Sequence, residues 1–270
     1  MHKPRISVIM GIYNCAPTLQ EALDSLYAQT YQDFEIILCE DGSTDHTYEI
    51  ALANQKQHPN IVLLRNPQNL GLNKTLNNCL AVAKGEYVAR MDGDDISLPE
   101  RFEKEVNFLD SHPEFAIVSA PMIYFDDNGV FGRGKGGQTP TKKSFIYGTP
   151  HPHAPCMVRR EAYDKVNGYT VDKRLLRNED YHLWMKMYAM GFRGYNLEEC
   201  LYSMRDDRNA TKRRNWTGRR NEAYSRWVAC RTLHLPIKGY LYCLRPIILY
   251  FMPTALYEYL HKKNLRKISK

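Results

Sequence analysis

The sequence lacks a long uninterrupted run of apolar residues. A helix that spans a membrane needs about 20 of them, whereas the apolar region 241–260 is broken by Arg245, Pro246 and Pro253. The first residues, 1–5, contain no apolar segment either, so we expect no signal peptide. These two absences predict a protein without transmembrane helices.

Paired cysteines are also missing. The seven cysteines are scattered singly along the chain, and no two of them form a C-x-x-C pair. This spacing argues against a disulfide framework and against a zinc site. We therefore expect reduced thiols and a cytoplasmic protein.

Two glycine-rich phosphate-binding signatures do not occur where they are needed. The absence of a G-x-x-x-x-G-K-[ST] loop excludes a P-loop enzyme. No G-x-G-x-x-G follows the first expected strand, which argues against a dinucleotide-binding fold. A nucleotide that is bound through a bridging metal ion remains open.

The charge is unevenly distributed. Residues 1–200 hold 21 Lys and Arg against 26 Asp and Glu, a balance of −5, whereas residues 201–270 hold 16 against 4, a balance of +12. The net charge of +7 therefore belongs to the C-terminal part. Nucleic acid, an anionic membrane or a phosphorylated ligand would each complement this basic region.

Apolar strands and helical repeats alternate through the first 120 residues. We expect strands at 5–10, 34–39, 61–64, 86–91 and 115–119, with helices that begin after Pro17, at a Ser43 or Thr44 cap, near 72 and at Pro99. Such alternation predicts right-handed crossovers and an α/β fold, with a mostly parallel, Rossmann-like sheet flanked by helices.

After residue 120 the pattern changes. Asp127-Asn128-Gly129 lies between two short apolar runs and indicates a hairpin. A mobile glycine-rich loop is expected at 132–143, a strand at 156–158, a helix at 160–166 and another helix from about 178 to 191. From residue 206 onward we expect a basic, amphipathic helical extension.

Polar side chains follow three of the expected strands, at 13–14, 40–41 and 92–95. In parallel sheets, ligands bind at the carboxyl ends of the strands. The three aspartates within 92–95 repel one another unless a cation neutralises them, and oxygen ligands suit Mg²⁺ or Mn²⁺. The alternative is a solvated acidic turn, but three polar loops at one edge favour a site for a metal ion and a diphosphate.

Five segments together resemble the inverting nucleotide-sugar glycosyltransferases of family 2, whose fold is called GT-A. They are Ser-Val-Ile-Met-Gly-Ile-Tyr-Asn at 7–14, Glu-Asp-Gly-Ser-Thr-Asp at 40–45, Ala-Lys-Gly-Glu-Tyr-Val at 83–88, Met-Asp-Gly-Asp-Asp at 91–95 and Asn-Glu-Asp at 178–180. Their order and spacing are those of the family. Two positions differ, because Gly11 stands where the family usually has Pro and Glu40 where it often has Asp.

The resemblance implies a role for each matching residue. Contacts to the nucleotide-sugar are expected from Gly11, Tyr13, Asn14, Asp41 and Asp92, the divalent cation at Asp94, and the catalytic base at Asp180. Side chains expected to face the acceptor or a lid are Glu179, His151, His153 and Arg205. The motif leaves the role of Asp95 open.

This resemblance also implies an overall organisation. Residues 1–205 are expected to form the catalytic domain, with a nucleotide-binding half at 1–95 and an acceptor half at 96–205, followed by the extension 206–270. Processive relatives carry a Gln-x-x-Arg-Trp motif, but Ala223 replaces the Gln here. We therefore expect transfer of a single sugar at each encounter.

The expected reaction moves a sugar from a UDP-sugar to an acceptor hydroxyl, with Mg²⁺ or Mn²⁺ as cofactor. A lipid-linked glycan, such as a polyprenyl-diphosphate sugar, fits an enzyme whose basic extension lies on the cytoplasmic face of an anionic membrane. Two alternatives are weaker. A sugar-phosphate nucleotidyltransferase needs a basic glycine-rich loop after the first strand, and no recognised module supports nucleic-acid binding.

Overall fold

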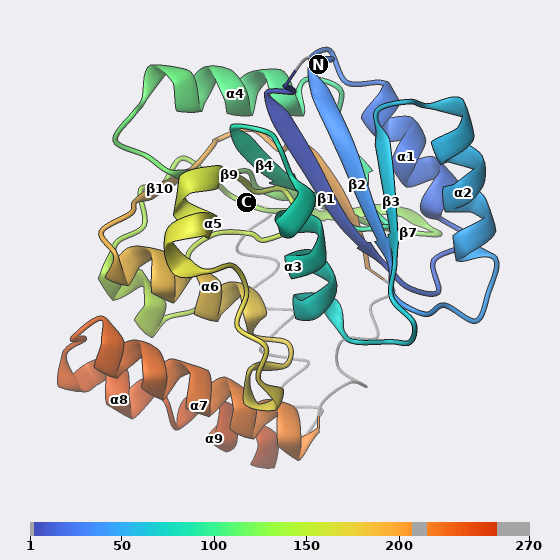
Figure 1. Ribbon diagram of the computed structural model, residues 1–270. Coiled ribbons are helices and arrows are strands. Elements are labelled where there is room, and N and C mark those ends of the chain that lie inside the picture. Colours follow the sequence, from blue (N-terminus) through green and yellow to red (C-terminus); the bar gives the residue numbers. More distant parts are fainter. Residues whose placement is uncertain (1–2, 207–214, 253–270) are drawn as a thin grey trace.

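The computed structural model describes residues 3–206 and 215–252 (Figure 1). A seven-stranded sheet has the order β10-β6-β9-β4-β1-β2-β3, and a four-stranded sheet has the order β5-β11-β7-β8. The strands are β1 (Ile6–Ile12), β2 (Phe34–Glu40), β3 (Ile61–Arg65), β4 (Tyr87–Arg90), β5 (Ile96–Ser97), β6 (Ile117–Ser119), β7 (Met122–Asp126), β8 (Gly129–Arg133), β9 (Met157–Arg159), β10 (Gly194–Asn196) and β11 (Tyr202–Arg205). The helices are α1 (Leu19–Tyr27), α2 (Thr47–Gln57), α3 (Leu72–Val82), α4 (Arg101–Ser111), α5 (Arg160–Val166), α6 (Glu179–Ala189), α7 (Trp216–Thr232), α8 (Ile237–Tyr242) and α9 (Arg245–Phe251).

The large sheet is parallel over β3, β2, β1 and β4, as predicted from the alternation of strands and helices. β9 is inserted between β4 and β6 and runs antiparallel to both. Because β9 runs in the opposite direction, the loop that precedes it reaches the edge where β1, β2 and β4 end. This edge is where a parallel sheet binds ligands.

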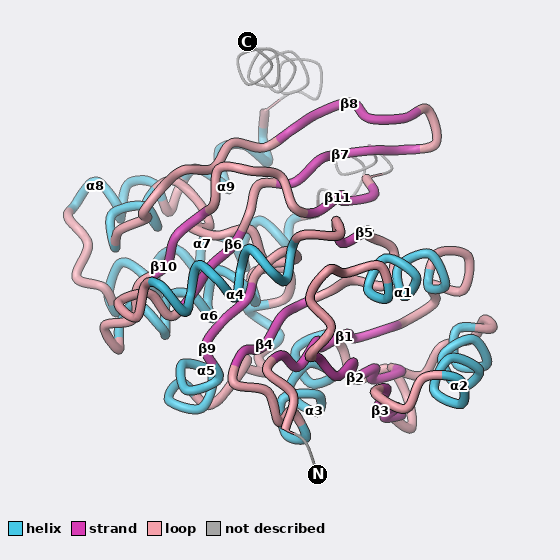
Figure 2. Tube along the Cα trace, turned by 90° about the horizontal axis from the view of Figure 1, so that it is seen from above, coloured by secondary structure: helices cyan, strands magenta, loops and turns pink. Residues whose placement is uncertain are grey.

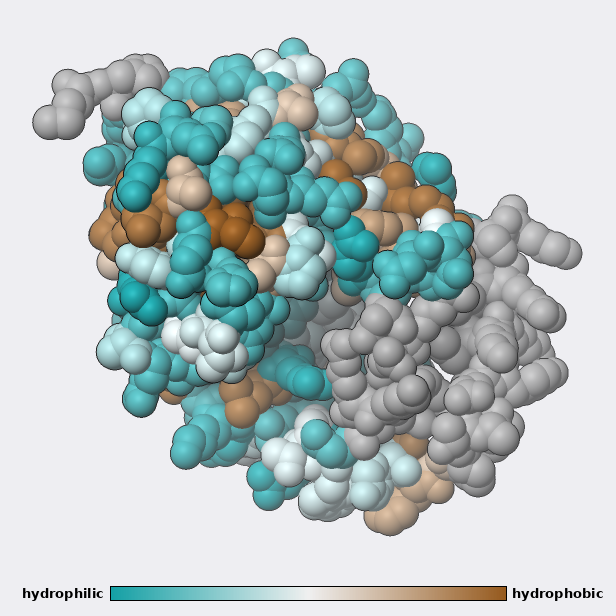
Figure 3. Space-filling view, turned by 90° about the vertical axis from the view of Figure 1, so that its right-hand side faces the viewer, coloured by the Kyte–Doolittle hydropathy of each residue, from teal (hydrophilic) through white to brown (hydrophobic). Residues whose placement is uncertain are grey.

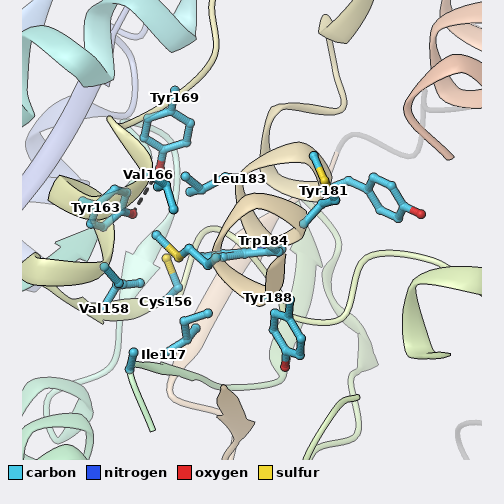
Figure 4. Close-up of a cluster of buried hydrophobic side chains, with 14 of the residues drawn as sticks. Ile117, Cys156, Val158, Tyr163, Val166, Tyr169, Tyr181, Leu183, Trp184 and Tyr188 are labelled. Carbon is cyan, nitrogen blue, oxygen red and sulfur yellow. Dashed lines mark hydrogen bonds between the residues drawn. The ribbon is translucent and has the colours of Figure 1, made fainter. Parts of the chain in front are cut away.

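Strand β1 is buried on both faces, which is typical of parallel sheets covered by helices. Val8 and Met10 belong to one core cluster with residues of α1 and α4, and Ile9 belongs to the other with residues of α3, α5 and α6. Figure 4 shows part of the second cluster, where Trp184 lies at the centre and the hydroxyls of Tyr163 and Tyr169 are 3.3 Å apart. The two clusters fix the sheet between its helical layers.

The start of β1 is anchored by a buried hydrogen-bond network. The Ser7 hydroxyl donates to Glu35 on β2 at 2.7 Å, and it accepts from the backbone amides of Lys84 and Gly85 at 3.0 and 2.7 Å. The segment 83–88, which carries part of the family resemblance, thus enters β4 through direct contact with β1. Its role in this structure is to position strands.

The predicted hairpin is present as β7 and β8, and β8 lies at one edge of the small sheet (Figure 2). Asp126 pairs with Gly129, whose φ of +104° suits glycine at the turn. The expected loop at 132–143 is partly ordered by pairing, because Gln138 forms a bridge with Asn196 of β10. In the small sheet β11 also pairs with β5, the strand that directly follows the acidic segment 92–95.

Helices α7, α8 and α9 form a layer beneath α6 (Figure 1). Ala229 and Cys230 of α7, and Leu233 just after it, join the core cluster of α6. This part of the expected extension therefore packs on the rest of the fold. None of the helices within 3–206 and 215–252 is long and apolar enough to cross a membrane. The opposite part of the molecule, around α1 and α2, presents a mostly hydrophilic surface with small apolar patches (Figure 3).

Candidate active site

The loop after β1 is tied to the loop after β2. The backbone amide of Asn14 donates to the Ser43 hydroxyl at 3.1 Å, and the Asn14 side chain accepts from the Thr44 amide at 2.8 Å. Asn14 adopts a φ of +47°, which Asn tolerates better than most residues. Tyr13 beside it is 46% exposed, so its ring is open to a planar ligand.

Asp41 is buried and organises a third loop. Its carboxylate accepts from the Asn66 side chain at 2.7 Å and from the amides of Leu70 and Gly71 at 2.8 and 2.9 Å. A carboxylate has about four acceptor positions, so one remains for a ligand. A cavity of about 620 Å³ borders these loops and is lined by Gly42, Ser43 and residues 65–69.

The acidic segment after β4 is held by two arginines. Arg90 Nη2 lies 2.6 Å from Asp92 Oδ1, and the Arg205 amide donates to the Asp95 carboxylate at 2.8 Å. Burial, followed by the charges of Asp92 and Asp94, raises the pKa of Asp95 to about 8. Partial removal of water, followed by the charge of Asp92, also raises the pKa of Asp94. A cation bound here would offset this accumulation of negative charge.

Asp180 lies in the first turn of α6 and is partly buried. Burial raises the pKa of its carboxyl, while hydrogen bonds from the Tyr181 amide and the Thr149 hydroxyl and the charge of Arg90 oppose the increase. Burial and the neighbouring Asp180 likewise raise the pKa of Glu179. A raised pKa brings a carboxylate closer to the range in which a general base works well near neutral pH.

Arg90 connects the two acidic groups. Only 6% of Arg90 is exposed, and its charge opposes the increase in the pKa of Asp94, Glu179 and Asp180. Arg90 thus contacts Asp92 directly and influences the pKa of the expected base, although about 90 residues separate the two acidic groups in the chain. Arg90 was not among the residues predicted for the site. Its position in the sequence, a charged residue between an apolar strand and an acidic run, is the signal that could have identified it.

The two histidines expected near the acceptor occupy different environments. His151 is fully buried, with Nδ1 2.7 Å from Asn196 Oδ1 and Nε2 2.9 Å from the Tyr188 hydroxyl. Both ring nitrogens are thus engaged by the protein, so His151 offers neither of them to an acceptor or a lid in this structure. His153 is partly exposed, and Nε2 lies 2.8 Å from the Tyr169 hydroxyl. Burial and the nearby Arg90 hold the pKa of His153 well below its usual range, so this ring is neutral at pH 7.

Arg205 and Gly11 have mainly structural surroundings. The Arg205 guanidinium donates to Glu21 at 2.6 Å and to the Asp94 carbonyl at 3.3 Å, so it holds the acidic segment against α1. Gly11 lies in β1, and an added Cβ would come within 3.1–3.2 Å of Leu72 and Thr75 on α3. Gly11 thus allows α3 to pack closely against the end of β1.

The residues of the acidic segment suit a hard divalent cation that takes only part of its ligands from the protein. No group of three or more His, Cys, Asp or Glu side chains in the described part of the chain is arranged to hold a metal ion by itself. Mg²⁺ commonly uses one or two carboxylates and takes its other ligands from phosphate oxygens and water. Asp94, which is exposed next to Asp92, suits a cation that binds together with a diphosphate.

Comparison with known proteins decides the family. The sequence pattern described as Glycosyl transferase family 2 matches residues 7–167. The chain belongs to this family. The resemblance inferred from the five segments is confirmed, and glycosyl transfer is favoured over nucleotidyl transfer and nucleic-acid binding.

Individual relatives agree with this assignment. EpsE of Bacillus subtilis, which is named as a glycosyltransferase, is 43% identical over 97% of this chain and 95% of its own length. The UDP-Gal:α-D-GlcNAc-diphosphoundecaprenol β-1,3-galactosyltransferase of Escherichia coli is 27% identical over 98% of both chains. This chain therefore aligns with both relatives over almost the whole length of each.

Solved structures support the GT-A fold. Staphylococcus aureus TarS in complex with UDP-GlcNAc superposes with a TM-score of 0.69 and 21% identity, over 84% of this chain and 66% of TarS. The mannosyltransferase PcManGT of Pyrobaculum calidifontis, in complex with GDP-Man and Mn²⁺, gives a TM-score of 0.66 and 18% identity, over 97% of this chain and 80% of its own. At these identities the likeness concerns the fold, which is the predicted α/β GT-A architecture.

Proposed function

We propose that this enzyme transfers one sugar from a UDP-sugar to a hydroxyl of a lipid-linked glycan and inverts the anomeric configuration. The observation that carries this proposal is the ion pair of the buried Arg90 with Asp92, together with the effect of the same charge on the pKa of Asp94 and of Asp180. The relative named as a galactosyltransferase acts from UDP-Gal onto a diphosphoundecaprenol-linked GlcNAc, which supports both substrate classes.

The donor is proposed to bind along the ends of β1, β2 and β4. The exposed Tyr13 ring offers a stacking surface for the base, and the free acceptor position of Asp41 suits an N–H group on the base edge. Asn14 joins the two loops that would enclose the nucleoside. Asp92, held by Arg90, is proposed to contact the ribose. Gly11, near the end of β1, is proposed to lie along the donor as well.

A Mg²⁺ or Mn²⁺ ion is proposed as cofactor, with Asp94 as its protein ligand. When bound, such an ion neutralises negative charge that develops on the departing diphosphate. Asp92 and Asp95 increase the negative potential around Asp94, and Arg90 and Arg205 keep the segment folded in its absence. The Mn²⁺ bound with GDP-Man in PcManGT supports this assignment.

Asp180 is proposed as the general base. In a single displacement, the acceptor oxygen attacks the anomeric carbon, the bond to the phosphate oxygen breaks, and the acceptor proton moves to the Asp180 carboxylate. One such displacement inverts the configuration. Glu179 and His153 border this region and are candidates for acceptor contacts, whereas Arg205 lies on the side of the acidic segment.

The outer surface of α8 and α9 is proposed to rest on an anionic membrane at its cytoplasmic face. Ile237, Leu241, Ile248 and Phe251 are 62–80% exposed, and Lys238 and Arg245 lie among them. Exposed apolar groups flanked by cations suit the boundary between headgroups and acyl chains. We propose residues 1–205 as the catalytic domain, with halves 1–95 and 96–205, and the extension 206–270 as the part that directs it toward a lipid-linked acceptor. Residues 207–214 and 253–270 of this extension lie outside the described residues.

A turnover assay with a panel of UDP-sugars, Mn²⁺ and a lipid-linked acceptor tests the function. We expect Asp180→Asn to bind UDP like the parent enzyme in calorimetry but to lose at least about 100-fold in kcat, because a positioned base contributes roughly 10²–10⁴. Near-normal turnover of this variant would remove Asp180 from the role of base. Unchanged transfer in the presence of a chelator would contradict the proposed role of the metal ion.

A further inference from the structure

A second cavity, of about 450 Å³, opens beside Asp180 between α6 and α7. It is lined by Thr149, Arg177, Asn178, Asp180, Tyr181, Asn215, Gly218, Arg219, Glu222 and Arg226. These residues belong to the start of α6, the segments before it and α7, and not to the loops after β1, β2 and β4. The cavity therefore borders the expected base without involving the nucleotide loops, and none of the roles proposed above gives it a ligand.

The charges in this cavity are unbalanced. Three arginines face two carboxylates, and Glu222 is already engaged by Arg219 at 2.8 Å and by Arg226 at 3.1 Å. Within residues 3–206 and 215–252, no side chain forms an ion pair or a hydrogen bond with the Arg177 guanidinium. An unpaired cation thus lies in the wall of a cavity that also contains Asp180.

The backbone at Arg177 is strained in the same place. Arg177 has a φ of +63°, a left-handed conformation that costs free energy for residues other than Gly and Asn. Such strain tends to be kept where a side chain has a function. In addition, the N-terminus of the 17-residue helix α7 lines the cavity at Asn215 and Gly218, and its dipole favours an anion.

We propose that this cavity binds the diphosphate that links the acceptor sugar to its lipid, with Arg177 and Arg219 as the cations. This inference rests on the proposed function and adds a subsite to it. Arginine recognises phosphate oxygens through paired, charge-assisted hydrogen bonds. A diphosphate held here keeps the sugar attached to it beside Asp180, whose carboxylate then receives the proton of the acceptor hydroxyl.

Two acceptors that differ only in the diphosphate test the subsite. One carries the sugar on a short lipid through a diphosphate, and the other is the same sugar as a neutral alkyl glycoside. We expect Arg177→Gln to raise KM for the first acceptor about tenfold or more, with kcat, the donor KM and the KM of the neutral acceptor unchanged. Arg177→Lys should recover part of the loss, because it restores the charge.

A matched control lies on α7, where Arg220 follows Arg219 but does not line the cavity. Arg219→Gln should raise the KM of the diphosphate acceptor, and Arg220→Gln should leave it unchanged. An equal effect of Arg177→Gln on both acceptors, or no effect on either, would overturn the proposal.

Binding of inorganic pyrophosphate, measured by calorimetry while UDP saturates the donor side, keeps the test independent of turnover. The parent protein should bind pyrophosphate at least about tenfold more tightly than Arg177→Gln. Equal affinities would show that the subsite does not exist, even if the enzyme transfers sugar. Lack of transfer by a protein that retains this difference would instead contradict the proposed function.

Discussion

At the scale of single residues, Arg90 links the groups that are proposed to take part in the reaction. Its ion pair with Asp92 and its charge near Asp94 and Asp180 come from one buried side chain at the end of β4. The Arg90 Nε atom is buried without a hydrogen-bond partner, which is costly in a folded protein. The benefit that accompanies this cost is a fixed positive charge that pairs with Asp92 and also acts on the proposed base, Asp180.

We predict that Arg90→Met moves the acidic limb of the kcat–pH profile to higher pH. Asp180 acts as a base only when ionised, so activity is lost as the pH falls through its pKa, which burial already raises. Removal of the Arg90 charge raises that pKa further. Arg90→Lys keeps the charge and should keep the profile. An acidic limb that stays in place in Arg90→Met would contradict the prediction, provided that thermal unfolding shows a folded protein.

The site residues differ in how far the sequence could predict them. Asp41, Asp92, Asp94 and Asp180 follow apolar strands or begin a helix, so local pattern and family resemblance single them out together. His151 could not be assigned in this way, because its burial depends on Asn196 and Tyr188, which are distant in sequence. A helix cap was also misplaced, since α2 begins at Thr47, whose amide donates to Asp45, and not at Ser43 or Thr44.

At the scale of elements, the prediction succeeded where the sequence shows a clear apolar run or repeat. β1, β2, α3 and α5 lie within two residues of the expected bounds, since β1 and β2 are predominantly apolar runs and the apolar positions of α3 follow the helical repeat. The antiparallel direction of β9 and the pairing of β5 with β11 were not predicted. These are strands of two to four residues, too short to show a period, and their partners are set by tertiary packing.

Close contact between β1 and the turn before β4 is tested by Gly85→Ala. An added Cβ would lie 2.4 Å from the Ser7 amide nitrogen and 2.7 Å from the Ile6 carbonyl carbon, so the backbone must shift. We expect a loss of about 1–3 kcal/mol in the free energy of unfolding, measured by urea denaturation. Gly148→Ala is the matched control, since nothing lies within 4 Å of its Cβ position, and it should change stability by no more than about 0.5 kcal/mol.

At the scale of the whole molecule, acidic and basic residues are concentrated in different parts of the chain. The acidic first 200 residues contain the proposed cation and proton sites, whereas the basic region lies beyond residue 200. Helices α7, α8 and α9 carry part of its charge, and residues 207–214 and 253–270 lie outside the described residues. The helical layer packs on α6, the helix that carries Asp180. An acceptor that approaches along α7 would therefore arrive at the base directly, and the cavity with Arg177 and Arg219 lies on that route.

This arrangement predicts that binding to vesicles depends on the outer surface of α8 and α9. In Leu241→Glu/Ile248→Glu, two exposed apolar side chains become anionic, which removes apolar contact and adds repulsion from an anionic bilayer. We expect flotation with vesicles that contain anionic lipid to fall at least about tenfold, since 1.4 kcal/mol already corresponds to that factor. Val130→Glu changes an equally exposed residue on β8 and should float like the parent. Because the substitutions lie outside the loops after β1, β2 and β4 and away from Asp180, transfer to a neutral, water-soluble acceptor should persist. If the double variant floats as well as the parent, the membrane contact lies elsewhere in the molecule.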